Sequence, residues 1–444
     1  MSQDLDPLRF FWHEPERLAT TRACVVGSYK NPQEKLSTLE HLQELQLLAE
    51  TQHIPVVQQY CFSIRMIKAA TFLTEGKLEE LQAGIQEQEI NLVIFDDEIS
   101  PSQQRNLEQL FKVPVIDRTE VILGVFAMRA KTREAKLQVR LAEVKYIMPR
   151  LKRMWTHLSR QAGGGGGLGG GGYLKGEGEK QIEIDKRILK KQIEALQEDI
   201  KQIKRYRETQ RALRAKTAIA VIAIVGYTNA GKSTLMNLLT NADVYTEDKL
   251  FATLDTTTRK YTLKNNQEVL FIDTVGFIRK LPHLLVAAFR STLEEAVHAD
   301  LILHVIDAKH PNAAEQAETT LAVLKELDAH DTPIITVLNK VDAVETLEEQ
   351  EHLHKLRFHY ARACLLSAKQ GDGLDLLEQE IITQLENRRA RLQLRIPQKE
   401  YHVLAAALRE GKVFSQEYDE NDVLVDVEVP RAMLFYFEQY KQHI

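Results

Sequence analysis

Cysteine is scarce in this chain of 444 residues, which holds only Cys24, Cys61 and Cys364. The three stand far apart and show no spacing typical of a metal site, so we expect small buried side chains in a reducing compartment. Long apolar runs are also missing, and none approaches the length that spans a bilayer. The first residues carry acids and lack the basic-then-apolar order of a secretory signal. We therefore expect a soluble, cytoplasmic protein without stable membrane insertion.

The overall composition is that of a globular protein, with 44% hydrophobic and 27% charged residues. The length favours about three domains with room for real cores. A formal net charge of −5 hides a basic segment at 129–216, which holds 23 Lys and Arg against 10 Asp and Glu. Such asymmetry indicates that this segment meets a polyanion, although a solvated helical face is the alternative interpretation.

Residues 1–128 alternate short β-branched runs with helical periodicity. Such alternation predicts a small α/β domain with a mainly parallel sheet. Asp96, Asp97 and Glu98 follow one of the predicted strands. No His or further carboxylate stands at suitable spacing, so a loop and helix N-cap is favoured over a metal site.

Residues 129–216 carry two stretches of apolar residues at alternating spacings of four and three. This pattern predicts two helices that cover each other as an antiparallel hairpin. A glycine-rich connection at 163–178 forms the predicted tip, and a flexible linker is the alternative. Pro149 should kink the first helix. The seams are Leu137, Leu141, Val144, Met148, Leu151, Trp155 and Leu158, then Ile182, Leu189, Ile193, Leu196, Ile200 and Ile203.

The first of these stretches includes "KYIMPRLKRMWTHLSR", which has five basic residues and no acid. Tyr146, Trp155 and His157 are interleaved with them, a composition that suits phosphate contacts and base stacking. Trp155 also lies on the apolar seam, where a core role competes with stacking. The basic residues are therefore the stronger indication of a nucleic-acid partner.

Residues 217–388 read as a doubly wound domain around a phosphate-loop signature. The motif G-x-x-x-x-G-K-S runs from Gly226 to Ser233, between a buried strand and a helix. Its glycines let backbone N–H groups wrap a phosphate chain, Lys232 neutralises the β and γ phosphates, and the Ser233 hydroxyl can bind Mg²⁺.

A second motif, Asp273 to Gly276, ends the next strand. Its carboxylate can hold Mg²⁺ through water, and the Gly276 N–H can meet the γ phosphate. Between the two motifs lies the polar segment "LFATLDTTTR". Thr253 is our choice for the threonine that completes the Mg²⁺ shell, although Thr256, Thr257 and Thr258 compete and spacing alone does not separate them.

Guanine recognition is predicted by Asn339 to Asp342, after another apolar strand. The Asp342 carboxylate can accept hydrogen bonds from guanine N1–H and N2–H₂, which favours GTP over ATP. Ser367, Ala368 and Lys369 supply the loop beneath the guanine O6. Each short motif is weak alone, but their order and spacing together indicate a GTP-binding domain.

We therefore predict catalytic roles for Lys232, Thr253, Asp273 and Gly276, and metal ligation by Ser233 and Thr253. The predicted nucleotide-binding residues are Gly226, Tyr227, Thr228, Asn229, Ala230, Gly231, Lys232, Ser233, Phe251, Ala252, Thr253, Leu254, Asp255, Asp273, Thr274, Val275, Gly276, Asn339, Lys340, Val341, Asp342, Ser367, Ala368 and Lys369.

Phe277 stands where many GTPases carry a glutamine that orients the attacking water. A hydrophobic side chain cannot orient water, so we expect slow intrinsic hydrolysis that a partner accelerates. Packing of Phe277 beneath the loop is compatible with this expectation. The last segment, 389–444, reads as strand, helix, two strands and a final helix, a small α+β domain.

The chain resembles the HflX family of GTPases, in the Obg-like, translation-factor-related branch. The resemblance covers almost the whole chain and rests on "TFLTEGKLEEL", "IFDDEISPSQQRNLE", "VIDRTEVILGVFAMRA", "WTHLSRQ", "GEGEKQIEIDKR", "GYTNAGKSTLMN", "LFATLD" and "DTVGFI". Family members usually have a shorter loop resembling "GGxGxxGPGETQLExDRR". Here the glycine run is longer, the proline is absent, and Lys180 stands at the usual threonine.

The resemblance implies a ribosome-associated GTPase that uses GTP and Mg²⁺. It implies N-terminal domains that dock on the large ribosomal subunit and its rRNA, and a hairpin tip that reaches toward the peptidyl-transferase centre. It further implies that the protein, like family members in the GTP state, can dissociate stalled or idle ribosomes and rescue them after stress. It also supports Ser233 and Thr253 as Mg²⁺ ligands, "FATLD" as a switch segment, and a hydrophobic residue in place of the catalytic glutamine.

Two alternatives remain: a GTP-regulated protein that binds free RNA or acts in subunit assembly, and a GTP-dependent adaptor of a protein complex. The basic hairpin disfavours the adaptor, and the additional α/β domain disfavours the free-RNA module. Since a hairpin that covers its own seams needs no second chain, we expect a monomer.

Overall fold

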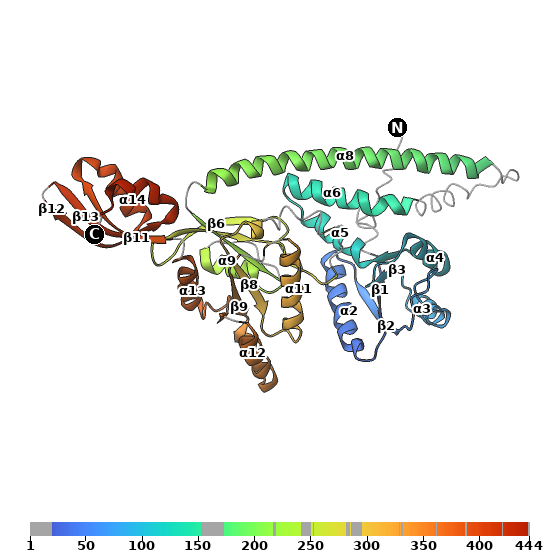
Figure 1. The fold of residues 1–444 in the computed structure, drawn as a ribbon. Coiled ribbons are helices and arrows are strands. Elements are labelled where there is room, and N and C mark those ends of the chain that lie inside the picture. The colour runs from blue at the N-terminus through green and yellow to red at the C-terminus, as the bar shows by residue number, and fades with distance from the viewer. Residues whose placement is uncertain are drawn as a thin grey trace. The chain divides into compact units, whose positions relative to one another are not determined.

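The computed structural model divides the chain into two compact units. One unit comprises Met1–Gln202 with Leu281–Phe289, and the other comprises Ile203–Lys280 with Arg290–Ile444. The structure describes residues 20–151, 173–215, 219–240, 250–251, 253–280, 285, 295–327, 329, 332–360, 362–386, 389–419 and 421–442. Figure 1 shows the ribbon and labels many of the helices and strands of both units.

A four-stranded parallel sheet with strand order β2-β1-β3-β4 forms the centre of the first unit. Its strands are β1 (Ala23–Tyr29), β2 (Val56–Ser63), β3 (Leu92–Phe95) and β4 (Val115–Asp117). The helices α2 (Glu34–Thr51), α3 (Glu75–Glu87), α4 (Pro101–Phe111) and α5 (Arg118–Arg129) alternate with them. Parallel neighbours need a crossover after each strand, and these helices supply it. The predicted small α/β fold is confirmed.

The cysteines are free thiols in this fold. Cys24 lies on β1 and is fully buried, and burial raises its pKa to about 12. Cys61 and Cys364 are only partly buried. The expectation of a small buried side chain therefore fits Cys24 best.

The first helix of the predicted hairpin is α6 (Arg133–Ile147), which is followed by the 3-10 turn η2 (Met148–Arg150). Pro149 lies in this turn, as expected for a residue that lacks an N–H and clashes with the preceding helical turn. The side chains of α6 are buried over more than one seam, since α6 also contacts α5. The heptad pattern thus describes only part of the packing of α6.

The second helix, α8 (Tyr173–Ala215), runs for 43 residues. Leu189 is buried and Ile193, Leu196, Ile200 and Ile203 are partly buried, in agreement with the predicted seam. Because α8 begins at Tyr173, residues 173–178 are helical although the sequence pattern placed them in the glycine-rich connection. Leu174, Lys175 and Glu177 in this stretch are favourable in helices, which lets the helix propagate through Gly176 and Gly178. The remainder of that connection, 163–172, lies outside the described residues, as do Trp155 and His157.

A six-stranded sheet with strand order β10-β9-β8-β5-β7-β6 forms the core of the second unit. Five strands are parallel, as predicted: β5 (Ala220–Gly226), β7 (Glu268–Asp273), β8 (Leu301–Asp307), β9 (Ile334–Asn339) and β10 (Ala363–Leu365). The sixth, β6 (Thr257–Thr262), pairs with β7 in the antiparallel direction. The helices are α9 (Lys232–Thr240), α11 (Ala313–Glu326), α12 (Leu347–His359) and α13 (Leu374–Glu386), and η3 (Val341–Ala343) is a single turn.

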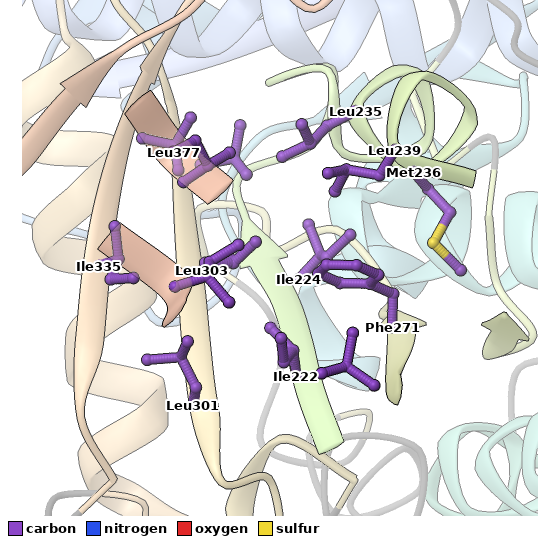
Figure 2. Packing of buried hydrophobic residues seen from close by; sticks show 14 of the residues in the cluster. Ile222, Ile224, Leu235, Met236, Leu239, Phe271, Leu301, Leu303, Ile335 and Leu377 are labelled. Carbon is purple, nitrogen blue, oxygen red and sulfur yellow. The ribbon is translucent and has the colours of Figure 1, made fainter. Parts of the chain in front are cut away.

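Apolar side chains of the central strands pack against α9 and α13 on one face of this sheet (Figure 2). Ile222, Ile224, Phe271 and Leu303 are among the fully buried members. A second cluster, which includes Ile306, packs beside α11 and α12 on the other face. Since strands covered on both faces are apolar throughout, the runs in the sequence are continuous rather than alternating. The predicted doubly wound P-loop fold is confirmed.

The C-terminal segment forms an antiparallel sheet with strand order β11-β13-β12. Its elements are β11 (Arg389–Pro397), α14 (Tyr401–Glu410), β12 (Lys412–Asp419), β13 (Asp422–Pro430) and α15 (Leu434–Phe437), with the single turns η4 (Gln398–Glu400), η5 (Arg431–Met433) and η6 (Glu438–Tyr440). It has its own apolar cluster, centred on Val425, Val427 and Phe437. Across all described helices, none is long and apolar enough to cross a membrane.

Candidate nucleotide site

The loop between β5 and α9 has the backbone of a phosphate-binding loop. Gly226 has φ +155 and Gly231 has φ +92, conformations that L side chains rarely adopt. A Cβ at Gly226 would collide with the Val305 carbonyl oxygen, and one at Gly231 would collide with the Asn339 side-chain amide. The two glycines therefore let the loop pass close to β8 and β9.

Lys232 is the first residue of α9 and its ammonium group is buried in the loop. Its Nζ donates to the carbonyl oxygens of Gly226, at 3.1 Å, and Tyr227, at 2.7 Å. Burial lowers the pKa of Lys232 to about 8, while the nearby Asp273 carboxylate opposes that shift. The ammonium is thus held where the loop closes, the position from which a lysine can neutralise phosphate charge.

Three oxygen-bearing side chains converge beside Lys232. The Ser233 hydroxyl lies 2.9 Å from Thr253 Oγ1 and donates to Asp273 Oδ2 at 2.8 Å. Asp273 is fully buried, and its Oδ1 has no hydrogen-bond partner in the described part of the chain. Burial raises the pKa of this carboxyl, although Lys232 and the two hydroxyls lower it. A buried carboxylate oxygen beside two hydroxyls suits a hard divalent cation such as Mg²⁺.

Three of the competing threonines between the two motifs occupy different places in the structure. Thr253 reaches Ser233, whereas Thr257 and Thr258 begin β6 and pair with Asp273 and Ile272 of β7 through the backbone. The polar stretch that the sequence pattern placed in a turn therefore contains the start of a strand. Phe251 and Leu254 are buried, and Ala252 lies outside the described residues.

Asn339 ties the proposed guanine-binding segments to the phosphate loop. Its Nδ2 donates to the Ala230 carbonyl oxygen at 2.8 Å, and its Oδ1 accepts from the Ala368 N–H at 2.9 Å. Lys340, in the left-handed region at φ 65, pairs with Asp307 at 2.7 Å. Asp342 follows in η3, where it is half-buried. The three motifs that are separated in the sequence are thus brought to one edge of the sheet.

The segment after Asp273 pairs with the phosphate loop. Thr274 Oγ1 donates to the Ile224 carbonyl oxygen at 2.8 Å, a structural contact. Gly276 lies so close that a Cβ there would come within 2.9 Å of Lys232 Nζ. Phe277 is 2% exposed and forms a parallel bridge with Tyr227. The Phe277 ring therefore packs in the interior, as the sequence interpretation allowed.

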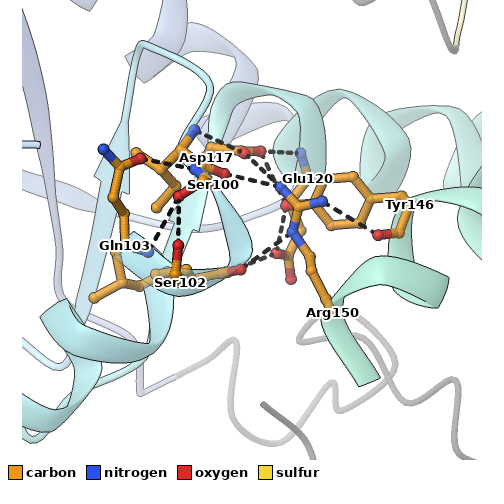
Figure 3. Close-up of polar contacts among 10 residues, drawn as sticks. Ser100, Ser102, Gln103, Asp117, Glu120, Tyr146 and Arg150 are labelled. Atoms are coloured by element: carbon orange, nitrogen blue, oxygen red, sulfur yellow. Dashed lines mark hydrogen bonds and ion pairs between the residues drawn. The ribbon is translucent and has the colours of Figure 1, made fainter. Parts of the chain in front are cut away.

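Tyr146 and Arg150 belong to the basic stretch that was considered for nucleic-acid contacts. Both are buried and make polar contacts within the first unit (Figure 3). Tyr146 is buried, and its hydroxyl donates to Asp117 at 3.1 Å and Glu120 at 3.2 Å. The Arg150 guanidinium stacks over the Tyr146 ring, 3.7 Å from its centroid, and its NH2 donates to Asp117 at 3.3 Å. The prediction that these side chains face a nucleic acid is wrong, because both are held at the carboxyl edge of the N-terminal sheet.

The acidic run after β3 forms ion pairs and hydrogen bonds. Among the described residues, no three His, Cys, Asp or Glu side chains are grouped so that they could hold a metal ion. Asp96 forms a buried ion pair with Arg118 at 2.6 Å, and Asp97 accepts from Ser28 at 2.8 Å. Ser100, rather than an acid of the run, caps helix α4. The loop interpretation of this segment agrees with these contacts.

The sequence interpretation missed two contacts near the site. Asp307 ends β8 and pairs with Lys340, and its place at a strand end beside those of β5 and β9 could have indicated it. The Tyr227 hydroxyl accepts a hydrogen bond from the Arg279 N–H, and no local pattern indicates that contact.

Comparison with known proteins finds relatives over most of the chain. Three family profiles match in chain order: GTP-binding GTPase N-terminal at residues 39–127, GTP-binding GTPase Middle Region at 129–214, and 50S ribosome-binding GTPase at 221–340. GTPase HflX of Chlamydia pneumoniae is 44% identical over 425 residues, which cover 96% of this chain and 89% of that protein. GTPase HflX of Escherichia coli strain K12 is 40% identical over 391 residues, which cover 88% of this chain and 89% of that protein.

Among solved structures, the chain is similar to a GTP-binding protein from Sulfolobus solfataricus in complex with GDP. The identity is 23%, the TM-score is 0.41, and the match covers 82% of this chain and 98% of that chain.

Proposed function

Because the chain belongs to the HflX family of GTPases, we propose that it binds the large ribosomal subunit and its rRNA and dissociates or rescues stalled or idle ribosomes under stress. GTP binding and hydrolysis are the activities for which this family is named. The observation that carries the ribosomal part is the match of residues 221–340 to a family described as 50S ribosome-binding GTPases.

The surface of α8 supports an RNA partner. On several turns of α8, basic side chains are exposed to solvent. They are Lys186, Arg187, Lys190, Lys191, Lys201, Lys204 and Arg205. Since Arg150 is buried, α8 rather than the end of α6 supplies described basic groups for phosphate contacts.

We propose that the nucleotide binds along the carboxyl edge of the six-stranded sheet. The loop from Gly226 to Ser233 would cradle the phosphates, and Lys232 would neutralise them. Ser233 and Thr253 would ligate Mg²⁺, with Asp273 holding it through water. When bound, this ion would supply positive charge that stabilises the phosphates during hydrolysis.

Guanine would lie between two loops that Asn339 holds together, with Asp342 accepting from N1–H and N2–H₂. Ser367, Ala368 and Lys369 would lie beneath O6. The Asn339 bonds to Ala230 and Ala368 support this assignment, because they fix the base-binding loops relative to the phosphate loop.

Hydrolysis by the isolated protein should be slow. The buried Phe277 offers no hydrogen-bonding group to the attacking water, so a partner that orders the switches would provide the acceleration. We further propose that the protein works in the cytoplasm as a monomer.

Co-sedimentation with purified ribosomal subunits tests the proposed role. The protein should pellet with the large subunit in the presence of a non-hydrolysable GTP analogue and release with GDP, and the subunit should raise the rate of GTP hydrolysis. Binding should fall steeply with added salt if phosphate contacts contribute. Failure to bind the large subunit in every nucleotide state would refute the ribosomal role, and retention by free RNA alone would favour the RNA-binding alternative.

Substitution tests the nucleotide site separately. Lys232→Ala should abolish tight GTP binding, while Lys309→Ala, at an exposed lysine in the same unit, should leave it unchanged. Asp342→Asn should weaken the preference for guanine over other bases, as measured by competition between GTP and XTP or ATP. Unchanged affinity and preference in both site variants would show that the nucleotide binds elsewhere.

A further inference from the structure

Tyr227 makes a contact that phosphate binding does not require of its side chain. It is the second residue of the phosphate loop, where backbone groups face the nucleotide and residue type is unspecified. Here the side chain is 5% exposed, and its hydroxyl accepts a hydrogen bond from the backbone N–H of Arg279 at 2.7 Å. Arg279 lies three residues beyond Gly276, in the segment that follows the DTVG motif.

Two backbone bonds also join the phosphate loop to that segment. The Phe277 N–H donates to the Gly226 carbonyl oxygen at 3.1 Å, and the Thr228 N–H donates to the Phe277 carbonyl oxygen at 2.8 Å. Both of these are backbone bonds, available to any residue type. The bond to the Tyr227 hydroxyl depends on the side chain, and it extends the join from Phe277 to Arg279.

The join determines where Gly276 lies. In this arrangement Gly276 packs against Lys232 Nζ and Thr228, and a Cβ there would meet the Thr228 side chain at 2.8 Å. Ser233, Thr253 and Asp273 converge at the same time. Thr253 and the segment 276–279 therefore both lie against the phosphate loop, which is the arrangement that a γ phosphate requires and GDP does not.

We propose that Tyr227 is a positioning residue for GTP hydrolysis, whose hydroxyl holds residues 276–279 against the phosphate loop and keeps Gly276 beside Lys232. The inference rests on the proposed nucleotide site. It predicts that the Tyr227 hydroxyl contributes more to the binding of GTP than to the binding of GDP. Only a nucleotide with a γ phosphate gains when residues 276–279 are held against the phosphate loop.

Tyr227→Phe in the full-length protein removes the hydroxyl and retains the ring. The affinity for a non-hydrolysable GTP analogue should fall about three- to tenfold, the range expected for one hydrogen bond. The affinity for GDP should change less than about twofold, because no γ phosphate is present to recruit the segment. Single-turnover hydrolysis should slow at saturating GTP. The matched control is Tyr360→Phe, since the Tyr360 hydroxyl is buried without a hydrogen-bond partner in the described part of the same unit.

Hydrogen exchange provides an independent measurement. With the GTP analogue bound, the amide of Arg279 should exchange faster in Tyr227→Phe than in the wild type, while it stays protected in Tyr360→Phe. Equal loss of GDP and GTP-analogue affinity would indicate a general structural role and overturn the proposal, as would unchanged values for both. Wild-type protein that bound neither nucleotide would instead contradict the proposed site.

Discussion

His304 is a buried histidine with no polar partner in the described structure. It lies on β8, is 1% exposed, and neither ring nitrogen has a hydrogen bond there. The ring of Tyr360 stands edge-on to it, with the centroids 6.4 Å apart. Burial, together with the nearby charge of Lys232, lowers the pKa of His304 to about 4. The imidazole is therefore neutral in the folded protein at neutral pH.

The protonation of His304 should limit stability in acid. Its folded pKa lies below the unfolded value of about 6.5, so the unfolded chain binds the proton more readily. The penalty is absent above pH 6.5 and grows as the pH falls toward about 4, reaching about 2 kcal/mol at pH 5. Urea unfolding at pH 7 and pH 5 should therefore show a smaller loss for His304→Leu than for the wild type. His354→Gln, at an exposed position, is the control. An equal pH dependence in wild type and His304→Leu would contradict the prediction.

At the scale of elements, the junction between α6 and the N-terminal sheet depends on Arg150. Its Nε donates to Gln104 at 3.2 Å and its NH2 donates to the Ile99 carbonyl oxygen at 3.0 Å. Burial raises the pKa of the fully buried Asp117, while Arg150 lowers it and Asp117 also caps helix α5. One guanidinium thus contacts the loop before α4, α4 itself and the end of β4.

Replacing this guanidinium should destabilise the first unit strongly. Arg150→Met keeps an apolar stem but leaves Asp117 buried without its cation, which costs about 3–5 kcal/mol. Lys136→Met, at an exposed position on the same α6, should change the unfolding free energy by less than about 0.5 kcal/mol. Chemical unfolding monitored by circular dichroism provides the comparison. A loss of under 1 kcal/mol for Arg150→Met would show that the buried pair is dispensable.

The same elements show how far the sequence could predict the structure. Apolar runs and glycine positions are local signals, so β5, the loop to Ser233 and the parallel sheets were predictable. Arg150 is buried because it pairs with Asp117, 33 residues away in the sequence. A basic run does not indicate which of its side chains have such a distant partner. The polar, mostly exposed β6 lacks an apolar pattern, because only pairing with β7 makes it a strand. Likewise, the contact between Thr253 and Ser233 joins residues 20 positions apart, and no local pattern indicates it.

At the scale of the whole molecule, the glycine run should matter to the ribosome and not to the nucleotide. Residues 163–172 hold nine glycines and connect the two predicted helices in the sequence. Shortening the run to a few residues should leave GTP affinity unchanged, because the nucleotide motifs all lie beyond residue 217. Ribosome dissociation should be impaired, since glycine allows close backbone approach to a crowded surface. Dissociation assays with the shortened protein check this, and full activity would show that the run only connects the helices.

Helix α8 contributes residues to both compact units, since one unit ends at Gln202 and the other begins at Ile203. A continuous helix couples distance to rotation: each added residue lengthens it by about 1.5 Å and turns everything beyond it by about 100°. An insertion or deletion within α8 therefore moves the side chains that follow it to another face of the helix. Leu189 and Ile193 would then leave the buried side of α8. An insertion of about seven residues, or two turns, would return the later side chains nearly to their original face.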